Sequence, residues 1–182
     1  QELEATAREV FALYGYHEVR TPVVEPEPLY ARSVGEQTDI VSKEMYVFED
    51  KGEDRLAQRP EGTAGTIRAF IEHGAYVDGP QKWFYMGPMF RRERPQKGRY
   101  RQFHQIGVEA FGIAEPAIDA EQIAMVQDWL SRLGVTAALE LNSVGDPQCR
   151  PAYLADLRVY LASHAGQLCG ACRERTGKNP LR

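Results

Sequence analysis

The residues with the clearest chemical potential lie in one short loop of this 182-residue chain. Six of the eleven residues from 91 to 101 are basic and one is acidic, namely Arg91, Arg92, Arg94, Lys97, Arg99 and Arg101, with Glu93 between them. The whole chain carries a net charge of −4, so this positive charge is local. Guanidinium groups bind phosphate oxygens through two parallel hydrogen bonds. The loop therefore predicts an anion site, although a solvated basic loop is equally consistent with these residues alone.

The segment after the loop alternates in a way typical of a strand with two different faces. One face would carry Phe103, Gln105, Gly107 and Glu109, and the other His104, Ile106, Val108 and Ala110. The second face can pack against a core. The first places an amide and a carboxylate on either side of a glycine, which would leave a hollow between polar groups. We expect this face to line a pocket for a small polar ligand; a strand facing water is the alternative.

The segment before the loop has the same alternation. Trp83, Tyr85, Gly87, Met89 and Arg91 share one parity, so a hairpin would bring Arg91 to the face that carries Gln105 and Glu109. A phosphate-binding arginine and polar ligand-binding groups would then line a single hollow.

Several elements are expected to position these residues. Apolar periodicity predicts helices at about 3–14, 63–73, 119–133 and 151–164, and a helical turn at 27–36 before a polar loop at 36–39. Asp119 and Gln122 have the spacing of a capping box at the start of the third helix. Strands are expected at 17–25, 46–48, 55–59, 81–91, 102–111 and 135–142, with Pro22 indicating an edge or a strand end.

Three segments together resemble a known family. The run from Phe90 to Gln105 looks like motif 2 of class II aminoacyl-tRNA synthetases, and in its full spelling like the histidine-specific members. Residues 14–22 resemble motif 1, whose proline lies at a dimer interface, and residues 58–63 resemble the short amino-acid-binding loop of the histidine-specific family. The resemblance covers essentially the whole chain. It implies a mixed α+β fold, with the antiparallel sheet of that class flanked by helices and here incomplete.

The resemblance also implies roles for individual residues. Arg91 matches the catalytic arginine that holds the α-phosphate and the substrate carboxylate, and an ATP site is completed by Glu93, Arg99 and Phe103. Glu61, Thr63, Gln105 and Glu109 match the positions that bind histidine. Carboxylates suit this task because an α-ammonium and an imidazole N–H both need acceptors. Glu61 could equally be an acid that stabilises a helix N-terminus.

The implied activity is that of an aminoacyl-tRNA ligase, which joins histidine to ATP and transfers it to tRNA(His). ATP with Mg²⁺, histidine, tRNA(His) and a second copy in a homodimer are the expected cofactors and partners. Residues 1–182 would be part of the catalytic domain, with about 146–182 starting an insertion or completing the core. Neither motif 3 nor an anticodon-binding domain is recognisable, so the chain alone is expected to be inactive. The alternative is an inactive paralogue that regulates histidine biosynthesis; a threonine- or proline-specific enzyme fits the 105–109 pattern less well.

Composition limits the remaining possibilities. No run approaches the ~20 apolar residues that span a bilayer, so we expect no membrane partner. The three cysteines are an odd set without signs of an oxidising compartment, so we expect a cytoplasmic location. Cys169 and Cys172 have the spacing of a zinc knuckle, but only Cys149 and His164 could complete the four ligands that zinc requires. We therefore expect thiols and no metal.

Overall fold

The computed structural model describes residues 1–34, 44–143, 145–178 and 180–181. The predicted polar loop at 36–39 lies outside these residues. The chain divides into two compact units, Gln1–Ala137 and Ala138–Arg182, and each is described by itself.

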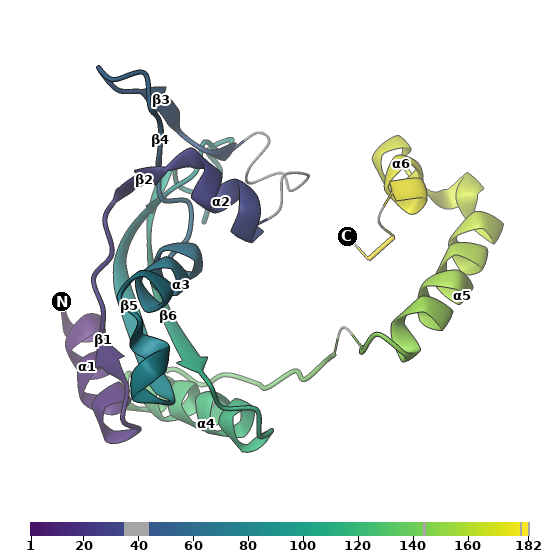
Figure 1. The fold of residues 1–182 in the computed structure, drawn as a ribbon. Helices are drawn as coiled ribbons and strands as arrows, with labels where there is room; N and C mark the ends of the chain where they lie inside the picture. The colour runs from purple at the N-terminus through teal and green to yellow at the C-terminus, as the bar shows by residue number, and fades with distance from the viewer. Residues whose placement is uncertain (35–43, 144, 179, 182) are drawn as a thin grey trace. The chain divides into compact units, whose positions relative to one another are not determined.

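A long antiparallel hairpin is the centre of the first unit (Figure 1). Strands β5 (Gln81–Phe90) and β6 (Gln102–Phe111) pair over their whole length, from Gln81 opposite Phe111 to Phe90 opposite Gln102. The short strand β1 (His17–Glu18) adds to β5 in parallel, in the order β1-β5-β6. The two strands predicted around the basic loop are confirmed. The run predicted as extended at 17–25 instead forms two short strands in different sheets, β1 and residues 24–26, with Pro22 in the break between them.

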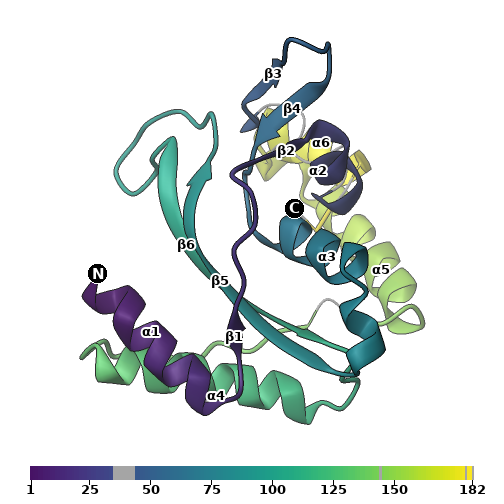
Figure 2. The ribbon, with the colours of Figure 1, turned by 60° about the vertical axis from the view of Figure 1, so that its left-hand side comes forward.

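One face of the hairpin carries the main hydrophobic core. Helices α1 (Glu2–Leu13) and α4 (Ala117–Arg132) cross one end of the hairpin in Figure 2. Their buried side chains Phe11 and Met125 cluster with Phe84 of β5, and Ile106 and Val108 pack against this cluster. The face predicted to pack against a core therefore does so, because its alternate residues are apolar.

The opposite face of the hairpin is covered by helix α3 (Thr63–Glu72), which is followed by the 3₁₀ helix η2 (Ala75–Asp78). Phe70 of α3 stacks on Phe111, with ring centroids 4.2 Å apart, and meets Trp83 edge to face at 5.8 Å. Helices thus lie on both faces of the sheet. This arrangement places the N-terminus of α3 over the polar face of the hairpin.

A second small sheet leads into α3. Its strands β2 (Val24–Pro26), β4 (Arg55–Gln58) and β3 (Val47–Glu49) pair antiparallel in the order β2-β4-β3, beside helix α2 (Glu27–Val34). Tyr30, Ala57 and Ala64 form its buried cluster with Met45. Buried Glu25 of β2 forms an ion pair with Arg68 of α3, with Nη2 of Arg68 2.8 Å from Oε1 of Glu25. The mixed α+β class expected from the sequence is confirmed.

Two local predictions are wrong. Helix α4 begins at Ala117 after the N-cap Pro116, so Asp119 lies inside the first turn and does not cap it. Proline presets the helical φ angle, which favours the earlier start. The strand predicted at 135–142 is not formed: Val135, Leu139 and Leu141 are exposed, and no strand among the described residues pairs with them. Alternation alone cannot make a strand without a neighbour to bond.

The second unit contains α5 (Cys149–Ser163), the 3₁₀ helix η3 (Ala165–Gln167) and α6 (Gly170–Lys178). Helix α5 confirms the predicted last helix, whereas α6 was not predicted. Cys149, Cys169 and Cys172 are exposed free thiols, and the described residues contain no cluster of three metal-ligating side chains. No helix in the described part of the chain is long and apolar enough to cross a membrane. The expected start of an insertion near residue 146 stays a prediction.

Candidate functional site

Arg91 follows directly on β5 and points toward the loop that begins α3. Its backbone N–H continues the hairpin ladder by donating to the carbonyl of Arg101 at 2.9 Å. Its Nε donates to the carbonyl of Pro60 at 2.8 Å, and its guanidinium carbon lies 5.0 Å from the centroid of the Phe103 ring. A cation held against an aromatic face is oriented without being neutralised. Arg91 and Phe103, predicted as partners in one site, are therefore adjacent.

Glu93 and Arg99 face each other across the basic loop. Nη1 of Arg99 lies 3.4 Å from Oε2 of Glu93, and this oxygen is buried without a hydrogen bond among the described residues. The Arg99 side chain is 60% exposed while that of Glu93 is 15% exposed. Because Arg99 is largely exposed and its contact with Glu93 is long, the pair contributes little to stability, and Arg99 can exchange this partner for an anion at small cost.

The polar face of the hairpin meets α3 through Thr63 and Glu109. The Thr63 hydroxyl donates to Oε1 of Glu109 at 2.7 Å. Burial raises the pKa of Glu109, and nearby Glu61 raises it further, while the hydrogen bond from Thr63 acts in the opposite direction. The carboxylate is thus partly removed from water and held by a neutral donor. It remains available to an additional N–H donor, because a carboxylate accepts several hydrogen bonds.

Glu61 lies one residue before the N-cap of α3 and binds the helix N-terminus with both oxygens. Its Oε2 accepts from the backbone N–H of Thr63 at 2.5 Å, and its Oε1 accepts from that of Ala64 at 3.0 Å. These groups are among the unpaired donors at the start of any helix. The interpretation of Glu61 as an acid at a helix N-terminus is confirmed. Its predicted contact with histidine stays a prediction.

Gln105 contributes an acceptor on the same face. Its Oε1 is buried and has no hydrogen-bond partner among the described residues. An unpaired buried acceptor costs about 1–3 kcal/mol, and a ligand N–H would remove that cost. Gln105 pairs in register with Gly87, whose missing side chain leaves room for the buried guanidinium of Arg59. Arg59 in turn donates to the carbonyls of Pro88 and Thr21, both at 2.9 Å.

The space above Gly107 is not empty, which corrects one expectation. Tyr85 lies directly opposite Gly107 in the hairpin, and its ring fills the volume that a side chain at 107 would take. The other side of the ring lies against Gly62, where an added methyl group would also overlap it. The hollow is therefore filled by the protein's own aromatic ring, and any ligand must lie beside it. Tyr85 was not predicted as a site residue, although its shared parity with Gly107 was a usable signal.

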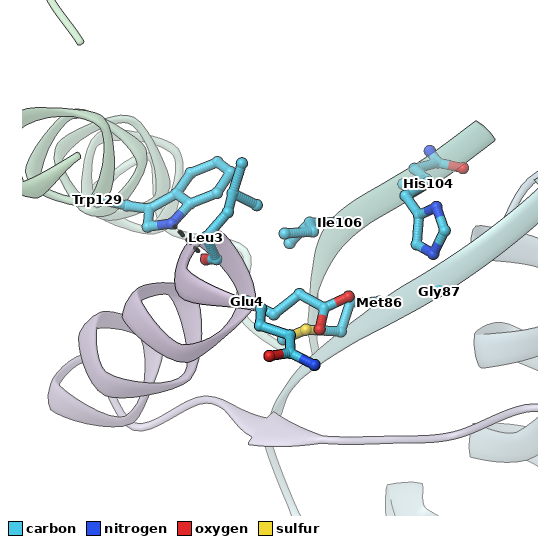
Figure 3. A pocket seen from close by; sticks show the side chains of 9 residues that line it. Leu3, Glu4, Met86, Gly87, His104, Ile106 and Trp129 are labelled. Carbon is cyan, nitrogen blue, oxygen red and sulfur yellow. Dashed lines mark hydrogen bonds between the residues drawn. The ribbon is translucent and has the colours of Figure 1, made fainter. Parts of the chain in front are cut away.

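A separate pocket of about 490 Å³ lies on the opposite face of the hairpin (Figure 3). Trp129 of α4 and Leu3 and Glu4 of α1 surround it together with Met86, His104 and Ile106. The indole of Trp129 donates to the carbonyl of Leu3 at 3.3 Å. Of the predicted site residues, Gln105 lines this pocket, whereas Arg91, Phe103, Thr63 and Glu109 do not.

The hairpin with a basic loop at its tip, flanked by helices on both faces, is part of the fold of class II aminoacyl-tRNA synthetases. The crystal structure of apo histidyl-tRNA synthetase from S. aureus is similar to this chain, with a TM-score of 0.74 and 37% sequence identity. The match covers all of this chain and 43% of the S. aureus chain. The model of the histidyl-tRNA synthetase family matches residues 1–148. The chain belongs to the histidyl-tRNA synthetase family.

Curated relatives agree with this assignment. The chain is 76% identical over 181 residues to the histidine–tRNA ligase of Anaeromyxobacter dehalogenans and 55% identical over 184 residues to that of Halothermothrix orenii. In both comparisons it is covered completely but spans only 44% of the relative's length.

Proposed function

We propose that the protein containing this chain activates histidine with ATP and transfers it to tRNA(His). Family membership supports the reaction class. The observation that carries the proposal is the position of Arg91 beside Pro60, at the loop that leads into α3, together with the bond from Thr63 to Glu109. A cation and an acceptor for a polar ligand thus flank the start of one helix.

In this proposal Arg91, Glu93, Arg99 and Phe103 bind ATP. Phe103 provides an aromatic surface for adenine, and Glu93 an acceptor for its amino group. Arg91 binds the α-phosphate and Arg99 the outer phosphates. The exposed position of Arg99 suits a group that moves onto phosphate, since its contact with Glu93 is 3.4 Å and weak. Mg²⁺ would arrive with ATP, whose phosphate oxygens are its usual ligands.

Glu61, Thr63, Gln105 and Glu109 bind histidine in the same proposal. The unpaired Oε1 of Gln105 and the carboxylate of Glu109 are acceptors for the ammonium and imidazole N–H groups. Glu61 already uses both oxygens on the start of α3. It therefore contributes to histidine binding through its negative charge and through the fixed position of Thr63.

The first chemical step joins the histidine carboxylate to the α-phosphorus of ATP and releases pyrophosphate. Negative charge gathers on the α-phosphate in the transition state, so a fixed arginine lowers the barrier more than it strengthens ground-state binding. In the second step a hydroxyl at the tRNA 3′ end attacks the histidyl carbonyl and AMP leaves. Arg91 is the residue of this chain that acts on the first step.

The alternative, an inactive paralogue that regulates histidine biosynthesis, is not favoured. Relatives at 52–76% identity are histidine–tRNA ligases, and the chain keeps all four residues assigned to ATP. We further propose that the protein is a homodimer. A cytoplasmic location suits the three free thiols, because the cytosol keeps cysteines reduced.

The test is amino-acid-dependent ATP–pyrophosphate exchange by the full-length protein with each of the twenty amino acids. We expect exchange with histidine far above that with any other amino acid. Histidine binding without any exchange would instead favour the regulatory alternative. Exchange with a different amino acid would overturn the assignment of the substrate.

A further inference from the structure

Tyr85 is a buried residue of the polar face with a hydroxyl that the proposed function leaves unused. It is 4% exposed, and its ring is held between two glycines, Gly62 in the loop before α3 and Gly107 in β6. Such close approach from both sides fixes the ring plane. The position of the Tyr85 hydroxyl is therefore fixed, and it lies 3.3 Å from the hydroxyl of Thr63.

The direction of this hydrogen bond follows from counting protons. A threonine hydroxyl has a single proton. Thr63 gives that proton to Oε1 of Glu109 at 2.7 Å, since an ionised carboxylate can only accept. The contact at 3.3 Å must then run from the Tyr85 hydroxyl to Oγ1 of Thr63. Burial and the nearby carboxylates raise the pKa of Tyr85, so the phenol keeps its proton throughout the working pH range.

We propose that Tyr85 is a positioning residue for histidine recognition: its hydroxyl donates to Thr63, and Thr63 donates to Glu109. This relay joins β5, the first residue of α3 and β6. It occupies Oε1 of Glu109, and among the described residues no hydrogen bond reaches Oε2, which is left for the ligand. The inference rests on the proposed function, because it assigns the free oxygen to the imidazole of histidine.

The relay also sets the charge of Glu109. Donation from Thr63 stabilises the carboxylate against the effect of burial. Hydrogen bonds in series strengthen one another, so losing the first weakens the second. Without the Tyr85 hydroxyl, the pKa of Glu109 should rise further. Histidine binding would then fail at a higher pH than in the wild type, because a protonated Glu109 has lost an acceptor.

The test is Tyr85→Phe in the full-length protein, which keeps the ring between the two glycines and removes only the hydroxyl. We expect the KM for histidine in pyrophosphate exchange to rise ~5- to 20-fold, with the KM for ATP changed less than twofold. The acid limb of the histidine kcat/KM profile should move to higher pH. The imidazole of the substrate titrates identically in both proteins, so the shift between the profiles reports on the enzyme.

Matched variants separate the relay from a general effect. Thr63→Val removes both the acceptor of the Tyr85 hydroxyl and the donor to Glu109, so it should reproduce the rise in histidine KM. Tyr76→Phe removes a hydroxyl from a tyrosine that is 61% exposed and should change nothing. An unchanged histidine KM and pH profile in Tyr85→Phe would overturn the proposal. Failure of the proposed function is distinct, since the wild type itself would then show no histidine-dependent exchange.

Discussion

Thr63 at the start of α3 donates a 2.7 Å hydrogen bond to Glu109 near the end of β6, 46 residues further along the chain. This bond joins the amino-acid-binding loop to the polar face of the hairpin. It makes the two segments one site, because the helix N-terminus cannot shift without moving the carboxylate. The following predictions concern this site and the residues around it.

Arg91→Ala in the full-length protein should lower the rate of adenylation ~100-fold or more, because a charge aimed at the transition state is worth about 3 kcal/mol. Pyrophosphate exchange at saturating histidine and ATP measures the effect. Arg132→Ala is the matched control, since Arg132 forms only a surface pair with Asp128 on α4. If exchange kept most of its rate in Arg91→Ala, Arg91 would not act on the α-phosphate.

Glu109→Gln should weaken the use of histidine and leave ATP almost unaffected, because the residues assigned to ATP lie elsewhere on the hairpin. The two apparent Michaelis constants in exchange assays check this, with Glu115→Gln in an exposed loop as the control. The variant should also lose discrimination against phenylalanine and leucine, which lack the imidazole N–H. An equal rise in both constants would show that this strand face is not the amino-acid pocket.

The pH dependence of histidine use should reflect the burial of Glu109. Burial raises the pKa of this carboxyl in the folded protein. The ionised form of Glu109 is needed as an acceptor. When the pH is lowered, kcat/KM for histidine should therefore fall at a higher pH than the one at which an ordinary glutamate is protonated. The same raised pKa means that Glu109 supports the fold most when protonated, and this contribution is lost as the pH rises through the folded value. Glu109→Gln, which cannot ionise, should remove this pH dependence from thermal unfolding curves.

Gly107→Ala should destabilise the protein by about 1–3 kcal/mol, because the new methyl group overlaps the Tyr85 ring and forces a core to repack. Chemical denaturation of the full-length protein measures this. Gly166→Ala is the control, since a methyl group there meets nothing within 4 Å. Equal stability of the two variants would show that Tyr85 does not occupy the space above Gly107.

The proposed homodimer should depend on the segment from 10 to 25. Leu13 is 70% exposed and Val24 is 38% exposed, which is unusual for apolar residues next to an edge strand. Leu13→Glu should weaken association of the full-length protein in sedimentation experiments. Val159→Glu, on an exposed position of α5, should not. A wild-type protein that is strictly monomeric at micromolar concentration would refute the dimer.

The sequence by itself determined the elements whose pattern is local. The period-two alternation at 81–91 and 102–111 identified both strands of the hairpin and the face that packs on α1 and α4. The helix at 63–73 and the family were equally readable, since both depend on residue types at short spacing. Local order suffices here because a strand with one apolar face has only one way to bury it.

Other features were decided only by the tertiary structure, because each depends on a partner distant in sequence. The alternating segment at 135–142 looks like a strand but finds none to pair with among the described residues. Gly107 indicated a hollow, yet the register of the hairpin places the Tyr85 ring in that space. Gly62, before α3, packs against the same ring. The same packing directs the single proton of Thr63 to Glu109, a choice that spacing along the chain cannot encode.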